Sequence, residues 1–180
     1  MFGLNMVVHK GRTIFMGDTS VHEYPSSEEM AEIAISASRV VKLFGFEPKV
    51  AFVSHSTFGQ PLTSRTKHIK NAVEILKNRN VNFEFDGDMQ PDVALDDEYK
   101  SLYPFSKIVG NANILIMPGQ HSAAISYKMM KTLGDAKVIG PLLIGLGLPI
   151  EIAPLRSSTS EIINLASIAA YSADVIDYKK

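Results

Sequence analysis

The sequence contains no cysteine among its 180 residues. This absence excludes a disulfide framework, a zinc-thiolate site and a thiol nucleophile, and it makes the chain indifferent to the redox state of its compartment. Long apolar runs are also lacking. No stretch approaches the roughly 18 consecutive apolar residues of a membrane-spanning helix, and residues 1–15 do not have the pattern of a secretory signal. We therefore expect an unprocessed cytoplasmic protein with no membrane partner.

An excess of charge of either sign is lacking as well, since the formal net charge is -1. A nucleic-acid partner would require many cationic side chains to neutralise its phosphates, so the composition argues against one, while small anionic ligands stay open. No linker-like stretch, internal repeat or low-complexity segment divides the chain. A chain of this length can bury a large core, and we expect one domain over residues 1–180.

Strand-like apolar runs alternate with helix-like stretches along the chain. Runs separated in this way predict parallel strands that are covered on both faces. The expected fold class is α/β, a three-layer αβα arrangement around a mostly parallel sheet. Strands are predicted at residues 13–17, 49–53, 83–87, 114–118, 137–145 and 149–154, and helices at 63–79, 91–103, 122–133 and 159–173, in addition to the first helix described next.

The first predicted helix has clear signals at both of its ends. Ser26 and Glu29 form a capping-box pattern, and Gly45 supplies a C-terminal stop. The last predicted helix, residues 159–173, is small and apolar over most of its circumference. A helix of that kind suits burial on several sides, so we expect it to pack on something beyond this chain.

A polar loop follows the predicted strand at residues 49–53. A strand that turns through small hydroxyl residues and a glycine into a helix presents N–H groups that suit an anion. The candidate phosphate contacts are Ser54, Ser56, Thr57 and Gly59, and the alternative is a turn that these hydroxyls close. Ser54 and His55 are adjacent at a strand end, where side chains point to opposite faces, so we do not expect a nucleophile and base pair.

The next helix begins with four cationic side chains in the segment "RTKHIK", residues 65–70. They could meet a polyphosphate over the loop, and the alternative is a solvated helix face. Of three further patterns, one stays open and two fail. The acidic segment "DGDMQPD", with Asp86, Asp88 and Asp92, is either a divalent-cation site or a polar turn. The histidines show no metal-ligand spacing, and "GLG" at 145–147 lacks the third glycine of a dinucleotide fingerprint.

Several longer segments, taken in their order along the chain, resemble one protein family. This family is the phosphate acetyl/butyryl transferases, and within it the segment "FGFEPKVAFVSHSTFG" is most similar to the C-terminal phosphotransacylase-like region of bacterial NADP-dependent malic enzymes. The resemblance covers about Gly11 to Ala173. The other segments are "DTSVHEYPSSEEMAEIAI", "FEFDGDMQPDVAL", "GNANILIMP", "SYKMMKTLG", "VIGPLLIGLGLPIEI" and "EIINLASIAAYSA".

The resemblance implies an architecture as well as a fold. The chain would be the second domain of a phosphotransacetylase-like unit, which is similar to isocitrate and isopropylmalate dehydrogenases. The helix at 159–173 would return to a first domain outside this chain, and the domain would pair in a homodimer. In the family, the acyl-CoA or phosphate ligand lies in the cleft between the two domains.

The family's catalytic motif is altered in this sequence. Active members have a serine-arginine pair and a later aspartate, where this chain has Pro154, Leu155 and Glu161, with Arg156 one place further on. The polar loop after the strand at 114–118 also departs from the family pattern, because it reads "GQHSAA". Transfer from an acyl phosphate needs a cation near its oxygens, so we expect no catalytic residue in this chain. The implied ligand contacts are Ser54, Ser56, Thr57, Gly59, Gln120, His121, Ser122 and Arg156.

The function implied is that of a non-catalytic domain that senses acetyl-CoA and dimerises within a NADP-dependent malic enzyme. Malate decarboxylation, NADP and its Mg or Mn ion would all lie outside this chain, which would hold no cofactor of its own. One alternative is a phosphate acetyl- or butyryltransferase that moves an acyl group between CoA and phosphate. Another is a purely structural or dimerisation module.

Overall fold

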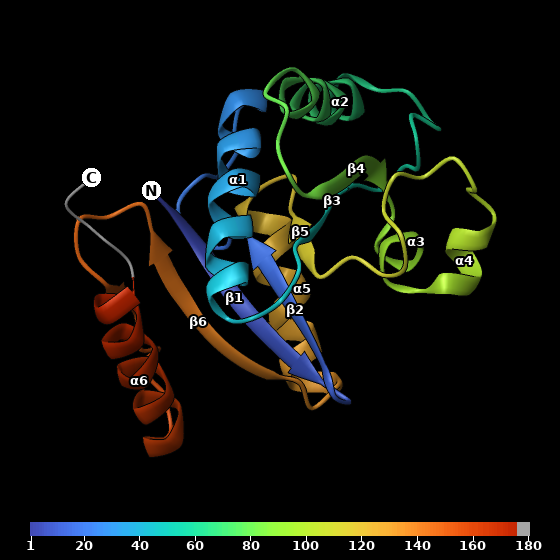
Figure 1. Cartoon of the computed structure of the whole chain (residues 1–180). Coiled ribbons are helices and arrows are strands. Elements are labelled where there is room, and N and C mark those ends of the chain that lie inside the picture. The colour runs from blue at the N-terminus through green and yellow to red at the C-terminus, as the bar shows by residue number, and fades with distance from the viewer. Residues whose placement is uncertain (176–180) are drawn as a thin grey trace.

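Seven strands form one mixed sheet at the centre of the molecule (Figure 1). The computed structural model describes residues 1–175. The strands are β1 (Phe2–His9), β2 (Arg12–Gly17), β3 (Lys49–Val53), β4 (Glu84–Met89), β5 (Ile114–Ile116), β6 (Lys137–Ile144) and β7 (Ile150–Glu151). Their order is β4-β3-β5-β2-β1-β6-β7. β4, β3, β5, β2 and β6 point one way and β1 and β7 the other, so the expected mostly parallel sheet is confirmed.

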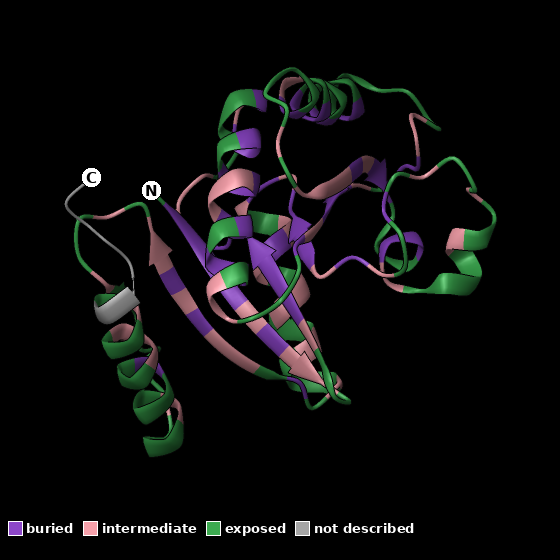
Figure 2. Ribbon diagram, viewed as in Figure 1, coloured by how far each residue is buried: buried purple, intermediate pink, exposed green. Residues whose placement is uncertain are grey.

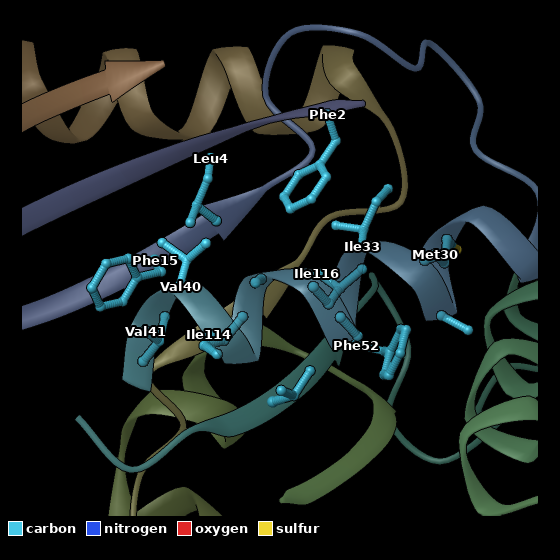
Figure 3. Close-up of a cluster of buried hydrophobic side chains, with 14 of the residues drawn as sticks. Phe2, Leu4, Phe15, Met30, Ile33, Val40, Val41, Phe52, Ile114 and Ile116 are labelled. Atoms are coloured by element: carbon cyan, nitrogen blue, oxygen red, sulfur yellow. The ribbon is translucent and has the colours of Figure 1, made fainter. Parts of the chain in front are cut away.

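Helices cover both faces of this sheet. The helices are α1 (Ser27–Leu43), α2 (Ser64–Asn78), α3 (Pro91–Leu95), α4 (Asp97–Ser101), α5 (Gln120–Leu133) and α6 (Thr159–Val175). Alternate side chains of each strand enter opposite cores. Phe52 packs in the core under α1 and α2, and its neighbours Ala51 and Val53 pack in the core beside α3 and α5. Figure 3 shows the first core, with Met30 and Ile33 of α1 against the sheet. The three-layer αβα arrangement is confirmed.

Strand β1 is absent from the sequence prediction, although it lies well inside the sheet. It pairs with β2 through a two-residue turn, and it also pairs with β6. Both turn residues have positive φ, 47° at Lys10 and 76° at Gly11, which is the backbone of a tight hairpin. The dipeptide Lys10–Gly11 between two apolar runs was therefore the available signal.

Three predicted boundaries need correction. The helix expected over 91–103 is two short helices, because Asp96 is extended and its carboxylate accepts from the N–H of Glu98, which starts α4. Helix α5 begins at Gln120 instead of residue 122, and β7 is shorter than the predicted run at 149–154. The capping box at Ser26 and Glu29 is confirmed, since each side chain accepts from the other residue's backbone N–H.

Helix α6 lies beside β6, at one side of the sheet (Figure 1). Most of its residues are exposed (Figure 2), and Leu165 is its one buried side chain among those described. That α6 packs on something beyond this chain stays a prediction, because within the chain β6, β7, Lys131 of α5 and Leu43 of α1 contact only part of its surface. That α6 returns to a first domain, and that residues 1–180 form one domain, both stay predictions. None of the helices in residues 1–175 combines the length and hydropathy needed to cross a bilayer.

Candidate functional site

Four loops meet at the edge of the sheet where β2, β5, β3 and β4 end. These strands are parallel neighbours, so their carboxyl ends lie side by side. The loop after β2 leads into α1, the loop after β3 into α2, and the loop after β5 into α5. Open α/β sheets bind ligands at this edge. Seven of the eight candidate ligand residues lie here, four in the loop after β3 and three in the first turn of α5.

The loop after β3 is fastened to the end of β4 by its own polar groups. Ser56 is fully buried and its hydroxyl donates to the Asp88 carboxylate, which also accepts from the N–H of Gly59 at 3.0 Å. The hydroxyl of Thr57 accepts from the N–H of Gln90 at 3.2 Å. These contacts close the turn from within. Contact of Ser56, Thr57 and Gly59 with a ligand stays a prediction, and any ligand would meet a loop whose shape is already set.

Ser54 and His55 are closer to each other than the sequence indicated. The Ser54 hydroxyl oxygen lies 3.5 Å from Nδ1 of His55 and 3.2 Å from the Ser56 hydroxyl oxygen. The prediction that the two side chains point to opposite faces is wrong because β3 ends at Val53, so strand alternation does not extend to them. A separation of 3.5 Å is long for a hydrogen bond to a hydroxyl, and this pair does not have the geometry of an activated nucleophile.

The acidic segment "DGDMQPD", which spans the end of β4 and the start of α3, makes separate contacts with different parts of the backbone. Asp86 accepts from the N–H of Lys107 at 2.8 Å, Asp88 holds the β3 loop, and Asp92 accepts from the N–H of Val93 at 2.8 Å. The three carboxylates therefore serve different parts of the backbone. No group of three or more potential metal ligands occurs in the part of the chain that the structure describes.

The start of α5 is joined to the loop after β2. His121 Nε2 lies 3.0 Å from Oε1 of Glu23, and the N–H of Gln120 donates to the carbonyl of His22 at 3.2 Å. Gly119 permits this approach, because a Cβ there would lie 2.4 Å from the Glu23 carbonyl oxygen. No side chain caps α5, and the Ser122 hydroxyl donates to the carbonyl of Gly119 instead. The N–H of Gln120 is thus engaged by the backbone of His22, and no side chain caps this start of α5 at the edge where the parallel strands end.

Asp18 organises the loop after β2, and the sequence analysis did not single it out. This carboxylate is buried and accepts from the backbone N–H groups of Gly3, Ser20, Val21 and His22 at 2.8 to 3.1 Å. Its Oδ2 also lies 2.6 Å from Nδ1 of His22. A buried carboxylate is stable with this number of donors. The signal was an aspartate directly after a strand, followed by small polar residues.

A depression of about 290 Å³ opens beside these loops, between the start of α2 and the segments after β2 and β5. Its lining includes Tyr24, Arg65, His68 and Pro118. The guanidinium carbon of Arg65 lies 5.3 Å from the centre of the Tyr24 ring. The ring of His68 is fixed in the wall, since its Nε2 lies 2.8 Å from the carbonyl oxygen of Pro25.

The altered catalytic motif lies elsewhere in this chain. Pro154 and Glu161 line a small pocket with Lys131, 11 residues beyond Gln120 along α5, which is about 16 Å of helix. The Glu161 carboxylate accepts from Lys131 Nζ at 2.8 Å and from the N–H of Ser158 at 2.7 Å, and these bonds lower its pKa to about 2. Leu155 and Arg156 are exposed. The structure therefore does not bring Arg156 to the loops that hold the other candidate residues.

Comparison with known proteins gives consistent results. The NADP-dependent malic enzyme of Rhizobium meliloti (strain 1021) is 46% identical over 173 residues, which are 96% of this chain and 23% of that protein. The phosphate acetyltransferase of Clostridium acetobutylicum is 36% identical over 162 residues, which are 89% of this chain and 49% of that protein. The solved EutD phosphotransacetylase from Staphylococcus aureus superposes with a TM-score of 0.88 at 27% identity, covering 96% of this chain and 54% of that one.

The chain thus spans from about a quarter to about half of the length of the proteins it matches. Residues 1–170 match the family described as Phosphate acetyl/butaryl transferase. This match includes every loop at the edge where β2, β5, β3 and β4 end, as well as the altered motif at 154–161. The chain belongs to the phosphate acetyl/butaryl transferase family.

Proposed function

We propose that this chain is a regulatory domain that binds acetyl-CoA without transferring its acyl group, within a NADP-dependent malic enzyme. The observation that carries the proposal is the pair Pro154 and Leu155, in a chain 46% identical to a malic enzyme of Rhizobium meliloti. Oxidative decarboxylation of malate to pyruvate, NADP and its Mg or Mn ion belong to parts of the protein outside this chain. The proposal includes a cytoplasmic location.

The loss of transfer chemistry follows from the residues at the altered motif. Charge develops on the phosphate oxygens during acyl transfer, and fixed donors or cations must stabilise it. Proline and leucine offer neither a side-chain donor nor a charge. Glu161, at the position of the family's aspartate, is already paired with Lys131 and with the backbone of Ser158. Binding does not require these transition-state contacts, so a ligand site can persist after the transfer chemistry is lost.

The sheet edge supplies the features that a phosphate-bearing ligand needs. The first N–H groups of α5 are not capped by a side chain, and the dipole of this helix favours an anion there. Arg65 and the hydroxyl-rich loop after β3 lie at the same edge. Regulation additionally requires two states of the whole protein with different affinity for acetyl-CoA.

Homodimerisation is the second part of the proposal. Five exposed apolar side chains on α5 and α6 support it, because large exposed apolar side chains that gather on an outer face of a protein favour association. These side chains are Ile125, Met129, Leu133, Ile162 and Ile163. A dimer would also give a regulatory ligand two equivalent sites through which to shift the quaternary state.

A transferase is the alternative function, and the similarity to the phosphate acetyltransferase of Clostridium acetobutylicum favours it. In that case the chain would take part in moving an acetyl or butyryl group between CoA and phosphate. Arg156 would have to act in place of the missing arginine, and the loop around it would have to shift by one residue.

The test uses the full-length protein that carries this chain. We expect acetyl-CoA to change the malate dependence of NADPH formation, and we expect no acetyl-CoA to form from acetyl phosphate and CoA. His121→Ala should weaken the acetyl-CoA effect several-fold, and Lys128→Ala, an exposed cation further along α5, is the matched control. Robust transferase turnover would establish the alternative. No acetyl-CoA effect on activity or on melting temperature would leave a structural module.

A further inference from the structure

The depression beside Tyr24 combines apolar walls with the guanidinium of Arg65. Tyr24, Pro25, Ile69 and Pro118 provide apolar surface, while Arg65 and His68 provide nitrogen groups. Its volume of about 290 Å³ is close to the lower end of small-molecule pockets, which begin near 300 Å³. No carboxylate is among its lining residues. A planar apolar group that carries a negative charge would complement such a lining.

Arg65 is available for an anion. Its guanidinium forms no ion pair with any carboxylate in the described part of the chain, and its contact is the face of the Tyr24 ring. It lies in the first turn of α2, where the helix dipole adds positive potential. His68 does not compete for the anion, because Pro25 and Ser27 already engage both of its ring nitrogens.

Tyr24 presents an aromatic surface at the mouth of the depression. Its side chain is 64% exposed, and the His121 ring lies 6.4 Å away, tilted by 32°. Exposed aromatic rings beside arginine are the usual platform for a nucleobase and its phosphate, because stacking and charge act together. Lys67 and Lys70 do not line the depression. Of the four cations in "RTKHIK", Arg65 is therefore the one placed to bind.

We propose that this depression binds the phosphorylated adenosine end of the acyl-CoA. The adenine ring lies against Tyr24, and a phosphate of the same nucleotide pairs with Arg65, which leaves the tyrosine face when the ligand enters. His68 is a positioning residue that holds the Pro25 wall. This assignment rests on the proposed acyl-CoA function, and it names the residues that recognise the nucleotide part of that ligand.

The experiment measures affinities of the full-length protein for CoA, 4′-phosphopantetheine and NADP by calorimetry. The variants are Tyr24→Leu and Arg65→Gln, and the matched control is Lys70→Gln, an exposed cation on α2 that does not line the depression. Both test positions are exposed, so melting temperatures should stay at the wild-type value. We expect each test variant to bind CoA about tenfold more weakly, since a stacking contact or a charge-assisted bond is lost. Affinity for 4′-phosphopantetheine, which lacks adenosine, should stay within twofold.

The outcomes separate this assignment from the function on which it rests. If wild-type protein binds CoA and both test variants bind it equally well, the nucleotide lies elsewhere and only this assignment is overturned. An equal loss of affinity for 4′-phosphopantetheine would also overturn it. If wild-type protein binds NADP but not CoA, or binds neither, the acyl-CoA function fails together with the assignment.

Discussion

Helices α1 and α6 have the same length and the same start, but opposite surroundings. Each has 17 residues, and each begins with a Ser-x-x-Glu capping box. Ser26 and Glu29 form the box at α1, and Ser158 and Glu161 form it at α6. Nine residues of α1 are buried, whereas Leu165 is the one buried side chain among those described in α6. Local signals therefore define where a helix forms and leave open what covers it.

The distribution of apolar residues explains what each helix requires. In α1 they form one stripe, and the sheet and α2 cover that stripe completely. In α6 they occur around most of the circumference, and the edge at β6 and β7 covers a single side. The surplus apolar surface of α6 fits a helix whose other neighbours belong to a second copy or to another part of a longer protein. This supports the proposed dimer and gives the comparison a direct test.

Isoleucine-to-alanine substitution in the two helices should have very different effects. Ile33 in α1 is 2% exposed, so Ile33→Ala should lower the free energy of unfolding by about 2–5 kcal/mol through lost burial and a cavity. Ile163 in α6 is 58% exposed, and Ile163→Ala should change it by less than about 0.5 kcal/mol. Urea unfolding at low protein concentration measures both.

Repeating the unfolding measurement at several protein concentrations provides the control for the two isoleucine variants. If a second copy covers α6, the cost of Ile163→Ala should grow as the protein concentration rises, while the cost of Ile33→Ala stays constant. A loss above about 1 kcal/mol at Ile163 in dilute protein would contradict the exposed placement of α6.

Elements with strong local signals were predictable from the sequence. The strand at 49–53 and the Ser26 cap are confirmed to the residue, because an apolar run and a capping box both depend on neighbours in the chain. β1 was missed although Lys10–Gly11 between two apolar runs signals its hairpin with β2, whereas its pairing with the distant β6 has no local signal. The break at Asp96 was missed because an aspartate can either continue a helix or cap the next one.

The candidate site was predictable only as a set of loops. The sequence identified Ser56 and Asp88 separately, one as a candidate anion contact and the other as part of either a divalent-cation site or a polar turn. It could not show that they are partners, because they are 32 residues apart and meet only when β3 and β4 pair. The link between His121 and Glu23, 98 residues apart, depends in the same way on the pairing of β2 with β5.

The hydrogen bond from Ser56 to Asp88 fixes the loop after β3 inside the protein, in contrast to the mostly exposed α6. Ser56→Ala should lower the free energy of unfolding by about 1–3 kcal/mol, because it removes a buried donor from a carboxylate. The matched control is Ser101→Ala at an exposed position, with an expected change below about 0.5 kcal/mol. Urea unfolding compares the two. Equal effects would mean that the loop after β3 is as loosely held as the surface of α4.

The smallest effects concern Glu151 in β7 and Glu161 in the first turn of α6, whose pKa values move in opposite directions. Burial raises the pKa of Glu151 to about 7, whereas bonds from Lys131 and Ser158 lower that of Glu161 to about 2. Ionised Glu151 therefore lowers the stability of the protein as pH rises from about 4.5 through 7. Glu151→Gln should stabilise the protein by about 1 kcal/mol at pH 8, since the side chain is only partly buried. At pH 4 the substitution should be neutral.

Glu161 has the opposite pH dependence. Its contribution is complete above its unfolded pKa near 4.5 and is lost as pH falls toward 2, so Glu161→Gln should destabilise the protein at pH 7 and become neutral near pH 2. The urea midpoint, followed from pH 2 to 8, measures both variants, and Glu28→Gln on the exposed side of α1 is the control. Parallel profiles for Glu151→Gln and Glu161→Gln would contradict the packing of α6 against β7 and α5, because only that packing gives the two carboxylates different surroundings.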